Sequence, residues 1–324
     1  MGDRMEIEVV DMAWKKPMGR SVIALGFFDG FHIGHQVVLK ETIEQAKKNE
    51  AIPVVLTFDC HPWEVLFPEK QPQRLMSEQD KSLYLRNFGF EKLLLLKSSE
   101  EFLNESAKHF LEWLKNSLNP VGLVSGPNYT FGSQKSGNVE FLSKWGIQNN
   151  INVTTMNPVM MDDVIVSSTR IRELLKIGEI SRVNKLLGRY FHLDGVVVHG
   201  DGRGKLLGFP TANMKINDYL ILPSDGVYGV KVRVGTNWYS GVASIGTNPT
   251  FSGERSRRLE VHILKLDENL YDQELRVAFC QYLRPENSFE NKEALILQIK
   301  NDIAIAREYL ENNIEEIMLP NWAK

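Results

Sequence analysis

The sequence predicts an α/β domain with a doubly wound parallel sheet, followed by a β-rich domain that ends in a long helix. Three observations predict this order. Short apolar runs alternate with amphipathic stretches in the first half, brief strands broken by Gly, Pro and Asn fill residues 188–283, and the last segment has apolar residues at helical spacing. We place the boundary near Gly188, which gives domains at 1–187 and 188–324.

Five short apolar runs carry the prediction of the α/β domain. They are Val22–Leu25, Val54–Phe58, Leu93–Leu96, Val121–Val124 and Val153–Met156. Between the third and fourth runs, six apolar residues at three- and four-residue spacing predict one helical face that can cover a sheet. These are Leu103, Ala107, Phe110, Leu111, Leu114 and Leu118. Two short helical stretches follow Arg170 and end near Leu187.

The end of the chain predicts one long helix packed on the β-rich domain. In segment 289–313 four apolar residues recur at helical spacing. They are Leu295, Ile299, Ile303 and Ala306.

Composition excludes several classes of protein. With 324 residues, 43% of them hydrophobic, and a net charge of −3, the chain can bury two cores but has no sequence-wide basic field for nucleic acid. Cys60 and Cys280 lie far apart and form no C-x-x-C pair, so we expect neither a disulfide nor a cysteine zinc site.

The purest aliphatic run, Leu93–Leu96, is too short to cross a bilayer. We expect a cytoplasmic protein that binds neither nucleic acid nor a membrane; the sequence carries no signal for an oligomeric state.

A phosphate-binding geometry is predicted after the first apolar run. Residues 26–35 read GFFDGFHIGH and lead into a helix-like stretch that begins near Gln36. A strand, a glycine turn and a helix start present backbone N–H groups to phosphate. Gly30 and Gly34 allow close approach of a triphosphate, and His32 and His35 can donate hydrogen bonds to it. For the isolated pattern, two histidines that merely cap or fill a turn are an equal alternative.

Three more segments belong to the same half. Residues 57–62 and 126–132 lie at the C-terminal ends of predicted strands, at the edge where open α/β sheets bind ligands. Residues 166–172 offer hydroxyls at a helix start and cations suited to phosphoryl chemistry, with a plain capped helix as the alternative.

A second cluster of chemistry-bearing residues lies at 200–213, which read GDGRGKLLGFPTAN. The glycines can present backbone N–H groups to phosphate, and Arg203 or Lys205 can balance its charge. The Thr211 hydroxyl and the Asn213 amide can ligate Mg²⁺. A mobile surface loop is the alternative for the bare pattern.

The four N-terminal segments, in this order, resemble the adenylyltransferase half of the prokaryotic bifunctional riboflavin kinase/FAD synthetase family over residues 20–187. The resemblance implies a Rossmann-like nucleotidyltransferase fold in which FMN attacks the α-phosphorus of ATP, with Mg²⁺ stabilising the pyrophosphate that leaves. The catalytic residues that it implies are His32, His35 and Arg170. The binding residues that it implies are Gly26, Phe28, Asp29, Gly30, Gly34, Asp59, Asn128, Phe131, Ser168 and Thr169. Asp59 is expected near the flavin and metal, and Asn128 near FMN. The sequence departs from the family pattern at Cys60, Pro127, Asn128 and Tyr129.

The C-terminal cluster resembles the Pro-Thr-Ala-Asn signature of flavokinases, and the likeness continues through 226–229, 246–250 and 259–262. It implies a six-stranded Greek-key barrel with a C-terminal helix, ATP and Mg²⁺ under the glycine-rich loop, and riboflavin across the cleft. Glu260 matches the family's catalytic base, although alone it reads as an exposed strand residue. Arg284 resembles a position near the flavin, with a surface salt bridge as the alternative. The binding residues that the resemblance implies are Gly200, Gly202, Arg203, Gly204, Lys205, Gly208, Pro210, Thr211 and Asn213, of which Thr211 and Asn213 would ligate Mg²⁺.

The function implied is FAD biosynthesis from riboflavin and ATP: phosphorylation of riboflavin to FMN in the C-terminal domain, then adenylylation of FMN to FAD in the N-terminal domain. Three alternatives stay open. Only one activity is retained, the chain is a flavin-responsive regulator without chemistry, or it is a nucleotidyltransferase for another phosphate. The regulator predicts loss of catalytic groups, whereas His32, Thr211 and Glu260 are present.

Overall fold

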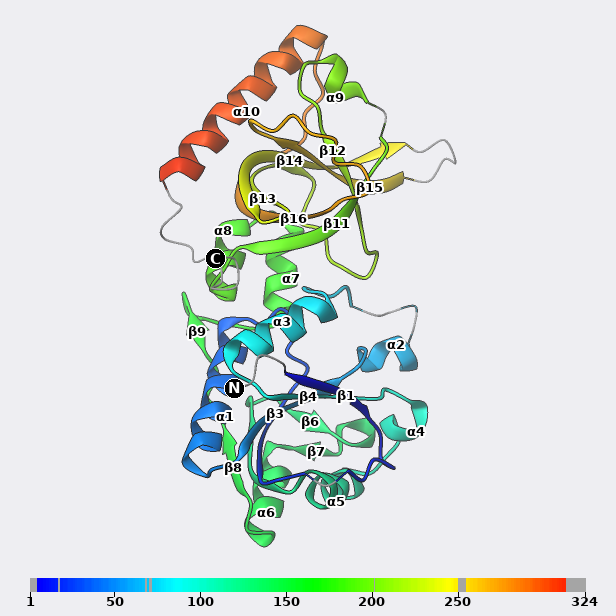
Figure 1. The fold of residues 1–324 in the computed structure, drawn as a ribbon, viewed down its shortest axis with the longest axis vertical. Helices are drawn as coiled ribbons and strands as arrows, with labels where there is room; N and C mark the ends of the chain where they lie inside the picture. The colour runs from blue at the N-terminus through cyan, green and yellow to red at the C-terminus, as the bar shows by residue number, and fades with distance from the viewer. Residues whose placement is uncertain are drawn as a thin grey trace. The chain divides into compact units, whose positions relative to one another are not determined.

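The chain forms two compact units (Figure 1). The computed structural model describes residues 5–16, 18–67, 69, 72–200, 202–249 and 255–312. One unit comprises Met1–Pro72 and Ser77–Ser167, and the other comprises Gln73–Met76 and Ser168–Lys324. Two helices, α7 (Ser168–Lys176) and α8 (Ile180–Leu187), therefore lie in the second unit. The boundary predicted near Gly188 falls later than this division and stays a prediction about what folds independently.

The first unit contains a six-stranded parallel sheet in the order β1-β4-β3-β2-β5-β8. Its strands are β1 (Glu6–Val10), β2 (Ser21–Leu25), β3 (Ile52–Phe58), β4 (Lys92–Leu96), β5 (Pro120–Ser125) and β8 (Asn152–Thr155). All five apolar runs are thus confirmed as strands, and β1 is an additional edge strand. The strand order reverses between β2 and β5, so the carboxyl ends of these two strands border the crevice where open α/β sheets bind ligands.

Helices and short strands surround this sheet. They are α1 (Ile33–Lys48), α2 (Pro62–Leu66), α3 (Glu78–Phe88), α4 (Glu100–Leu103), α5 (Ala107–Leu118), β6 (Thr130–Phe131), η2 (Ser133–Lys135), β7 (Gly137–Asn138), α6 (Val139–Gln148), β9 (Met160–Met161) and β10 (Val164–Ile165). The expectation of one helical face from Leu103 to Leu118 is wrong at its start. Leu103 ends α4, and Ser106 begins a new helix by accepting the backbone N–H of His109 at 3.1 Å. The other five residues of that face are buried on α5 against β2, β3 and β4.

The second unit contains a closed antiparallel barrel of six strands, as predicted, in the order β11-β12-β15-β14-β13-β16. Its strands are β11 (Phe191–Val198), β12 (Ala212–Ile216), β13 (Gly226–Val234), β14 (Asn237–Pro249), β15 (Arg255–Ile263) and β16 (Glu274–Arg284). The predicted terminal helix is α10 (Lys292–Asn312), and its Ala306 and Leu310 cover Val227 and Cys280 of the barrel wall. The glycine-rich loop holds a one-turn helix that was not predicted, α9 (Arg203–Leu206).

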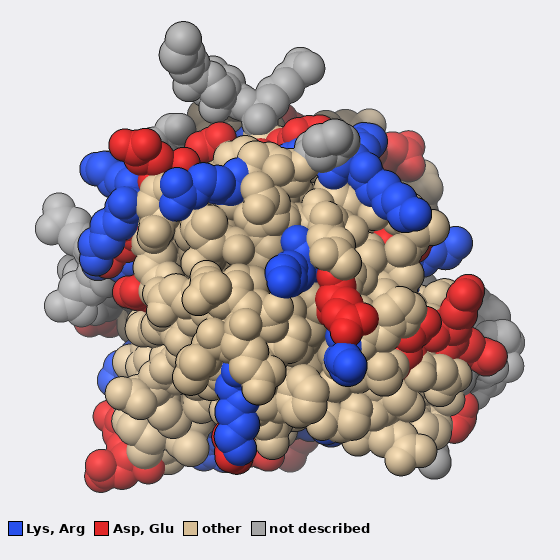
Figure 2. All heavy atoms as spheres, turned by 90° about the horizontal axis from the view of Figure 1, so that it is seen from below, with Lys and Arg blue, Asp and Glu red and all other residues tan. Residues whose placement is uncertain are grey.

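Figure 2 shows one face of the molecule, on which acidic and basic side chains are mixed near the rim and uncharged residues fill most of the middle. This face presents no continuous basic surface. Within the described ranges, no helix has the length and apolar character needed to cross a membrane.

Candidate active sites

The loop between β2 and α1 has an unusual backbone conformation at the predicted ligand edge. Phe28, Gly30 and Phe31 have φ angles of 56°, 82° and 47°. Bulky residues seldom adopt positive φ, and such conformations cluster at functional sites. Phe28 is 2% exposed, and a Cβ atom on Gly26 would lie 2.8 Å from its ring. Glycine at 26 is therefore required by the packing that fixes the loop.

His32 and His35 lie together at the start of α1, as predicted. His32 is the N-cap: its Nδ1 accepts the backbone N–H of His35 at 3.2 Å. In the neutral ring this bond leaves the proton on Nε2, which becomes a hydrogen-bond donor. The two rings stack with centroids 3.6 Å apart. Capping and phosphate binding are thus compatible roles, because they use different nitrogens of His32.

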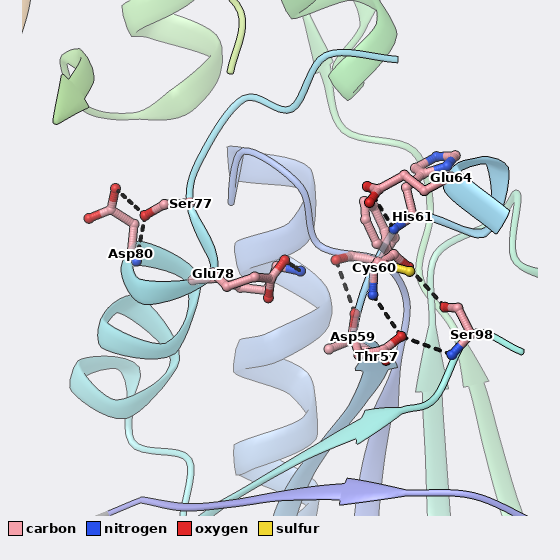
Figure 3. Close-up of polar contacts among 11 residues, drawn as sticks. Thr57, Asp59, Cys60, His61, Glu64, Ser77, Glu78, Asp80 and Ser98 are labelled. Carbon is pink, nitrogen blue, oxygen red and sulfur yellow. Dashed lines mark hydrogen bonds and ion pairs between the residues drawn. The ribbon is translucent and has the colours of Figure 1, made fainter. Parts of the chain in front are cut away.

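Asp59 joins the carboxyl ends of β3 and β4 (Figure 3). Its Oδ1 accepts two backbone N–H groups, from Cys60 and from Ser98, each at 2.8 Å. The Ser98 hydroxyl also donates to the Cys60 carbonyl at 3.0 Å. One carboxylate oxygen of Asp59 therefore shapes this edge of the site, while its place near flavin and metal stays a prediction.

The short helix α2 follows the same turn. His61 Nδ1 accepts the N–H of Trp63 at 3.1 Å, and Glu64 accepts the backbone N–H of His61 at 3.1 Å (Figure 3). This capping box begins α2. Three apolar side chains there are exposed by 44%, 42% and 46%: Trp63, Leu66 and Phe67. This apolar surface beside the site was not predicted, although a tryptophan directly after His-Pro was a signal for it.

The loop after β5 has one exposed and one buried predicted residue. Asn128 is exposed. Phe131 is 8% exposed, stacks on Tyr129 with centroids 5.6 Å apart, and belongs to the core. Phe131 therefore packs in the core and fixes the loop after β5. Its contact with a ligand stays a prediction.

Ser168, Thr169 and Arg170 form the first turn of α7, in the second unit. Arg170 Nη1 lies 3.0 Å from Glu173 Oε2. The closure of these three residues over the nucleotide stays a prediction.

The barrel brings Thr211, Asn213 and Glu260 together on its outer wall. Asn213 of β12 and Ser244 of β14 are the register partners of Glu260 on either side, and paired residues share a face of the sheet. Leu259 and Val261 are buried inside, so Glu260 faces outward. The Thr211 hydroxyl donates to Glu260 Oε2 at 3.4 Å.

Two glycines of the glycine-rich loop allow its backbone to lie close to Asn213 and Phe209. A Cβ atom on Gly200 would lie 2.1 Å from Asn213 Nδ2, and one on Gly204 would lie 2.4 Å from the Phe209 carbonyl oxygen. Both contacts need glycine. Gly202 and Gly208 have φ angles of 68° and 86°, which only glycine adopts freely. Lys205 is exposed, and the side chain of Arg203 lies outside the described residues.

Two further residues near this site, His262 and Glu286, had no predicted role. His262 Nδ1 lies 2.8 Å from the Pro210 carbonyl oxygen and donates to it, which ties β15 to the turn before Thr211. Its spacing of two from Glu260 was a signal, since alternate strand residues share a face. The Glu286 carboxylate lies against Gly246 of β14. Burial raises the pKa of Glu286, with Asp225 and Glu260 adding to the rise and Arg284 opposing it.

Arg284 makes the ion pair that was its alternative interpretation. Its Nε and Nη2 donate to Asp302 of α10 at 3.0 and 2.8 Å, and Asp302 is 2% exposed. The pair is partly buried and holds α10 to the end of β16, so a contact with flavin stays a prediction.

Comparison with known proteins gives the same two-part order. The family model described as FAD synthetase matches residues 15–170, and the one described as riboflavin kinase matches residues 187–310. Proteins named bifunctional riboflavin kinase/FMN adenylyltransferase from Listeria monocytogenes, Bacillus subtilis and Buchnera aphidicola subsp. Schizaphis graminum are 36%, 33% and 35% identical to the chain. The alignments cover 87%, 92% and 91% of this chain and 90%, 95% and 96% of those relatives.

The fold has a solved counterpart. A structure named as a macrolide-efflux protein from Streptococcus pneumoniae is 32% identical, with a TM-score of 0.83, over 92% of this chain and 98% of that one. Both matched domains occur in the expected order, and the relatives align over nearly their whole length. The chain therefore belongs to the family of bifunctional riboflavin kinase/FMN adenylyltransferases.

Proposed function

We propose that the chain catalyses two successive ATP-dependent reactions on small molecules: it phosphorylates riboflavin to FMN, then adenylylates FMN to FAD with release of pyrophosphate. The observation that carries the proposal is that predicted site residues come together in two separate places. One is the loop of His32 and His35 after β2, and the other is the pair of Thr211 and Glu260 on the barrel wall. Each lies in the part of the chain that the corresponding family model matches.

In the adenylyltransferase reaction, a phosphate oxygen of FMN attacks the α-phosphorus of ATP in line, and no covalent enzyme intermediate is required. His32 donates from Nε2 to a phosphate oxygen, and His35 donates from its ring, so both stabilise the charge that develops as pyrophosphate leaves. The first backbone N–H groups of α1 add to this field. Asn128 holds FMN, and Ser168, Thr169 and Arg170 close over the nucleotide.

In the kinase reaction, Glu260 accepts the proton of the ribityl hydroxyl as that oxygen attacks the γ-phosphorus of ATP and ADP leaves. The Thr211 hydroxyl orients the carboxylate through a long hydrogen bond of 3.4 Å, which leaves acceptor capacity on Glu260. The backbone of Gly200 and Gly204 covers the phosphates. Lys205 and Arg203 balance their charge.

The donor set at the kinase site fits Mg²⁺. Thr211 and Asn213 offer oxygen ligands, and Mg²⁺ commonly takes one or two protein oxygens and completes its shell with phosphate and water. Among the residues that the structure describes, no group of three or more His, Cys, Asp and Glu side chains could hold a metal. Bound with ATP, Mg²⁺ would neutralise charge on the phosphates. We place the reactions in the cytoplasm, because Cys60 and Cys280 are unpaired thiols.

The proposal is tested by assaying each reaction with its own substrate. Purified protein receives riboflavin in one reaction and FMN in another, both with Mg-ATP, and the flavins are separated by chromatography. We expect FMN and then FAD from the first, and FAD from the second. FMN from riboflavin with no FAD in either reaction, or FAD from FMN with unchanged riboflavin, would mean that one half only binds its ligand. Bound flavin without turnover in either reaction would favour a regulator.

A further inference from the structure

One face of helix α3 packs against the loop of residues 26–35, which carries His32 and His35. Lys81, Tyr84 and Phe88 lie at spacings of three and four, which places them on the same side of the helix. Phe31 of the loop stacks on Tyr84 with centroids 5.2 Å apart and meets Phe88 edge-on at 5.5 Å. Tyr84 and Phe88 are ordinary apolar supports. Lys81 completes the same face with a charge.

Lys81 is 1% exposed, which is rare for lysine. Its Nζ lies 3.1 Å from Glu78 Oε1 and 4.6 Å from the centre of the Phe27 ring. Glu78 is labelled in Figure 3, where it extends away from the start of α3. The buried ammonium thus has two described partners, a carboxylate and an aromatic face.

Phe27 is in turn fixed from two other elements. The Thr57 hydroxyl of β3 donates to the Phe27 carbonyl at 3.1 Å. The His61 ring, before α2, meets the Phe27 ring edge-on with centroids 4.9 Å apart. Phe27 directly precedes the strained residues that lead to His32. Its position therefore sets where the loop leaves β2.

A methionine or leucine would fill the space of Lys81 without the cost of removing a charge from water, which is several kcal/mol for an unpaired ion. A cation, however, is attracted to the face of an aromatic ring, whereas an apolar side chain in its place has no such electrostatic preference. The charge of Lys81 therefore serves to orient the Phe27 ring.

We propose that Lys81 is a positioning residue of the adenylyltransferase site: its ammonium holds Phe27, and through Phe27 it holds the loop that carries His32 and His35. The inference rests on the proposed function of that loop. Lys81 contacts no substrate in this account. It acts on ATP binding by keeping the loop in one conformation.

Four variants separate the charge from the packing. Lys81→Met keeps the stem and removes the charge, and Lys81→Arg keeps the charge. Phe27→Leu removes the aromatic face and tests the same contact from the other side. Lys40→Met is the matched control, because Lys40 is an exposed lysine on α1 whose ion pair with Glu44 is long, at 4.0 Å.

Hydrogen–deuterium exchange of the ligand-free protein tests the positioning without any reaction. We expect Lys81→Met and Phe27→Leu each to speed exchange in residues 26–35 by about tenfold, while residues 202–213 of the barrel stay unchanged. Lys40→Met should leave both segments at the parent rate. Unchanged exchange in residues 26–35 of Lys81→Met or of Phe27→Leu would overturn the inference, even if the parent chain makes no FAD and the proposed function fails.

Kinetics of FAD formation test the consequence. Lys81→Met should raise the KM for ATP by about tenfold and leave the KM for FMN and the kinase reaction within about twofold, and Lys81→Arg should recover most of the loss. The double variant with Phe27→Leu should be no worse than the more damaged single variant, because both remove one interaction. Equal loss of both reactions, additive effects, or an arginine variant as damaged as the methionine variant would contradict the proposal.

Discussion

The backbone N–H of His35 donates to Nδ1 of His32, and the two imidazole rings stack with their planes 18° apart. His32 therefore both starts α1 and keeps a donor on its other nitrogen. These two roles can be separated by mutation.

His32→Asn should retain the cap and lose the phosphate contact, because an asparagine oxygen caps a helix well but offers no donor at the position of Nε2. We expect FAD formation to fall by about 10²-fold or more, with FMN formation nearly intact and the unfolding free energy within about 1 kcal/mol. His32→Ala and His35→Ala should lose FAD formation as severely. Parent-level FAD formation by His32→Asn would leave His32 with a capping role alone.

His262→Leu should weaken the response of the kinase to Mg²⁺, because the turn before Thr211 loses its bond to β15. His262→Asn should retain it, since an asparagine N–H can replace the Nδ1 donor. We expect the Mg²⁺ concentration for half-maximal FMN formation to rise by about tenfold in the leucine variant alone. Equal Mg²⁺ responses in the two variants would contradict the role of the bond.

A fragment of residues 188–324 should fold and phosphorylate riboflavin, since it contains the barrel, the loop and α10. The structure adds that Asn184 of α8 accepts the backbone N–H of Phe191 at 2.7 Å and donates to the Phe279 carbonyl at 2.9 Å. A fragment of residues 168–324 should therefore be more stable to urea by about 1 to 3 kcal/mol. A folded but inert 188–324 would move the functional boundary to before α8.

Glu8 makes the stability of the first unit depend on pH. Lys16 chiefly lowers the pKa of Glu8 from 4.5 to about 2, with Lys92 adding to the effect and burial opposing it. The folded chain thus binds this proton more weakly than the unfolded chain, so the stabilisation is full above about pH 4.5 and is lost as the pH falls toward 2. Glu8→Gln should cost about 1 to 2 kcal/mol in urea unfolding at pH 7 and clearly less at pH 3, because the exposure of Lys16 weakens the pair. An equal cost at both pH values would contradict this.

The strands of the first unit could be predicted where they are buried on both faces, as β2 is. β1 was missed because it is an edge strand: Glu6 and Glu8 alternate with Ile7 and Val9, which are 48% and 61% exposed. The break before α5 was missed because the apolar spacing of Leu103 continues across it. Only the Ser106 cap shows that a new helix begins.

The residue types of both sites could be predicted because each motif is local in sequence. Contacts between distant segments could not, since they depend on how strands and helices meet. Asp59 with Ser98, Lys81 with Phe27, and His262 with Pro210 are of this kind. The role of Arg284 was predicted from the residues next to it in sequence, whereas its ion-pair partner Asp302 lies on α10.

Glu260→Gln should keep the shape of the kinase site and lose its base. We expect FMN formation to fall by about 10²- to 10⁴-fold with riboflavin binding largely retained. The Thr211 hydroxyl can still donate to the amide oxygen, so the fold of the barrel should not change. A rate close to that of the parent, where chemistry limits turnover, would assign the step to positioning alone.

The central claim is that two independent sites act in sequence, and a flavin time course with His32→Asn and Glu260→Gln tests it most directly. Given riboflavin and Mg-ATP, His32→Asn should accumulate FMN, whereas Glu260→Gln should leave riboflavin unchanged and still convert supplied FMN to FAD at the parent rate. An equal mixture of the two variants should make FAD from riboflavin. Loss of both reactions in either variant, as folded protein, would contradict the account.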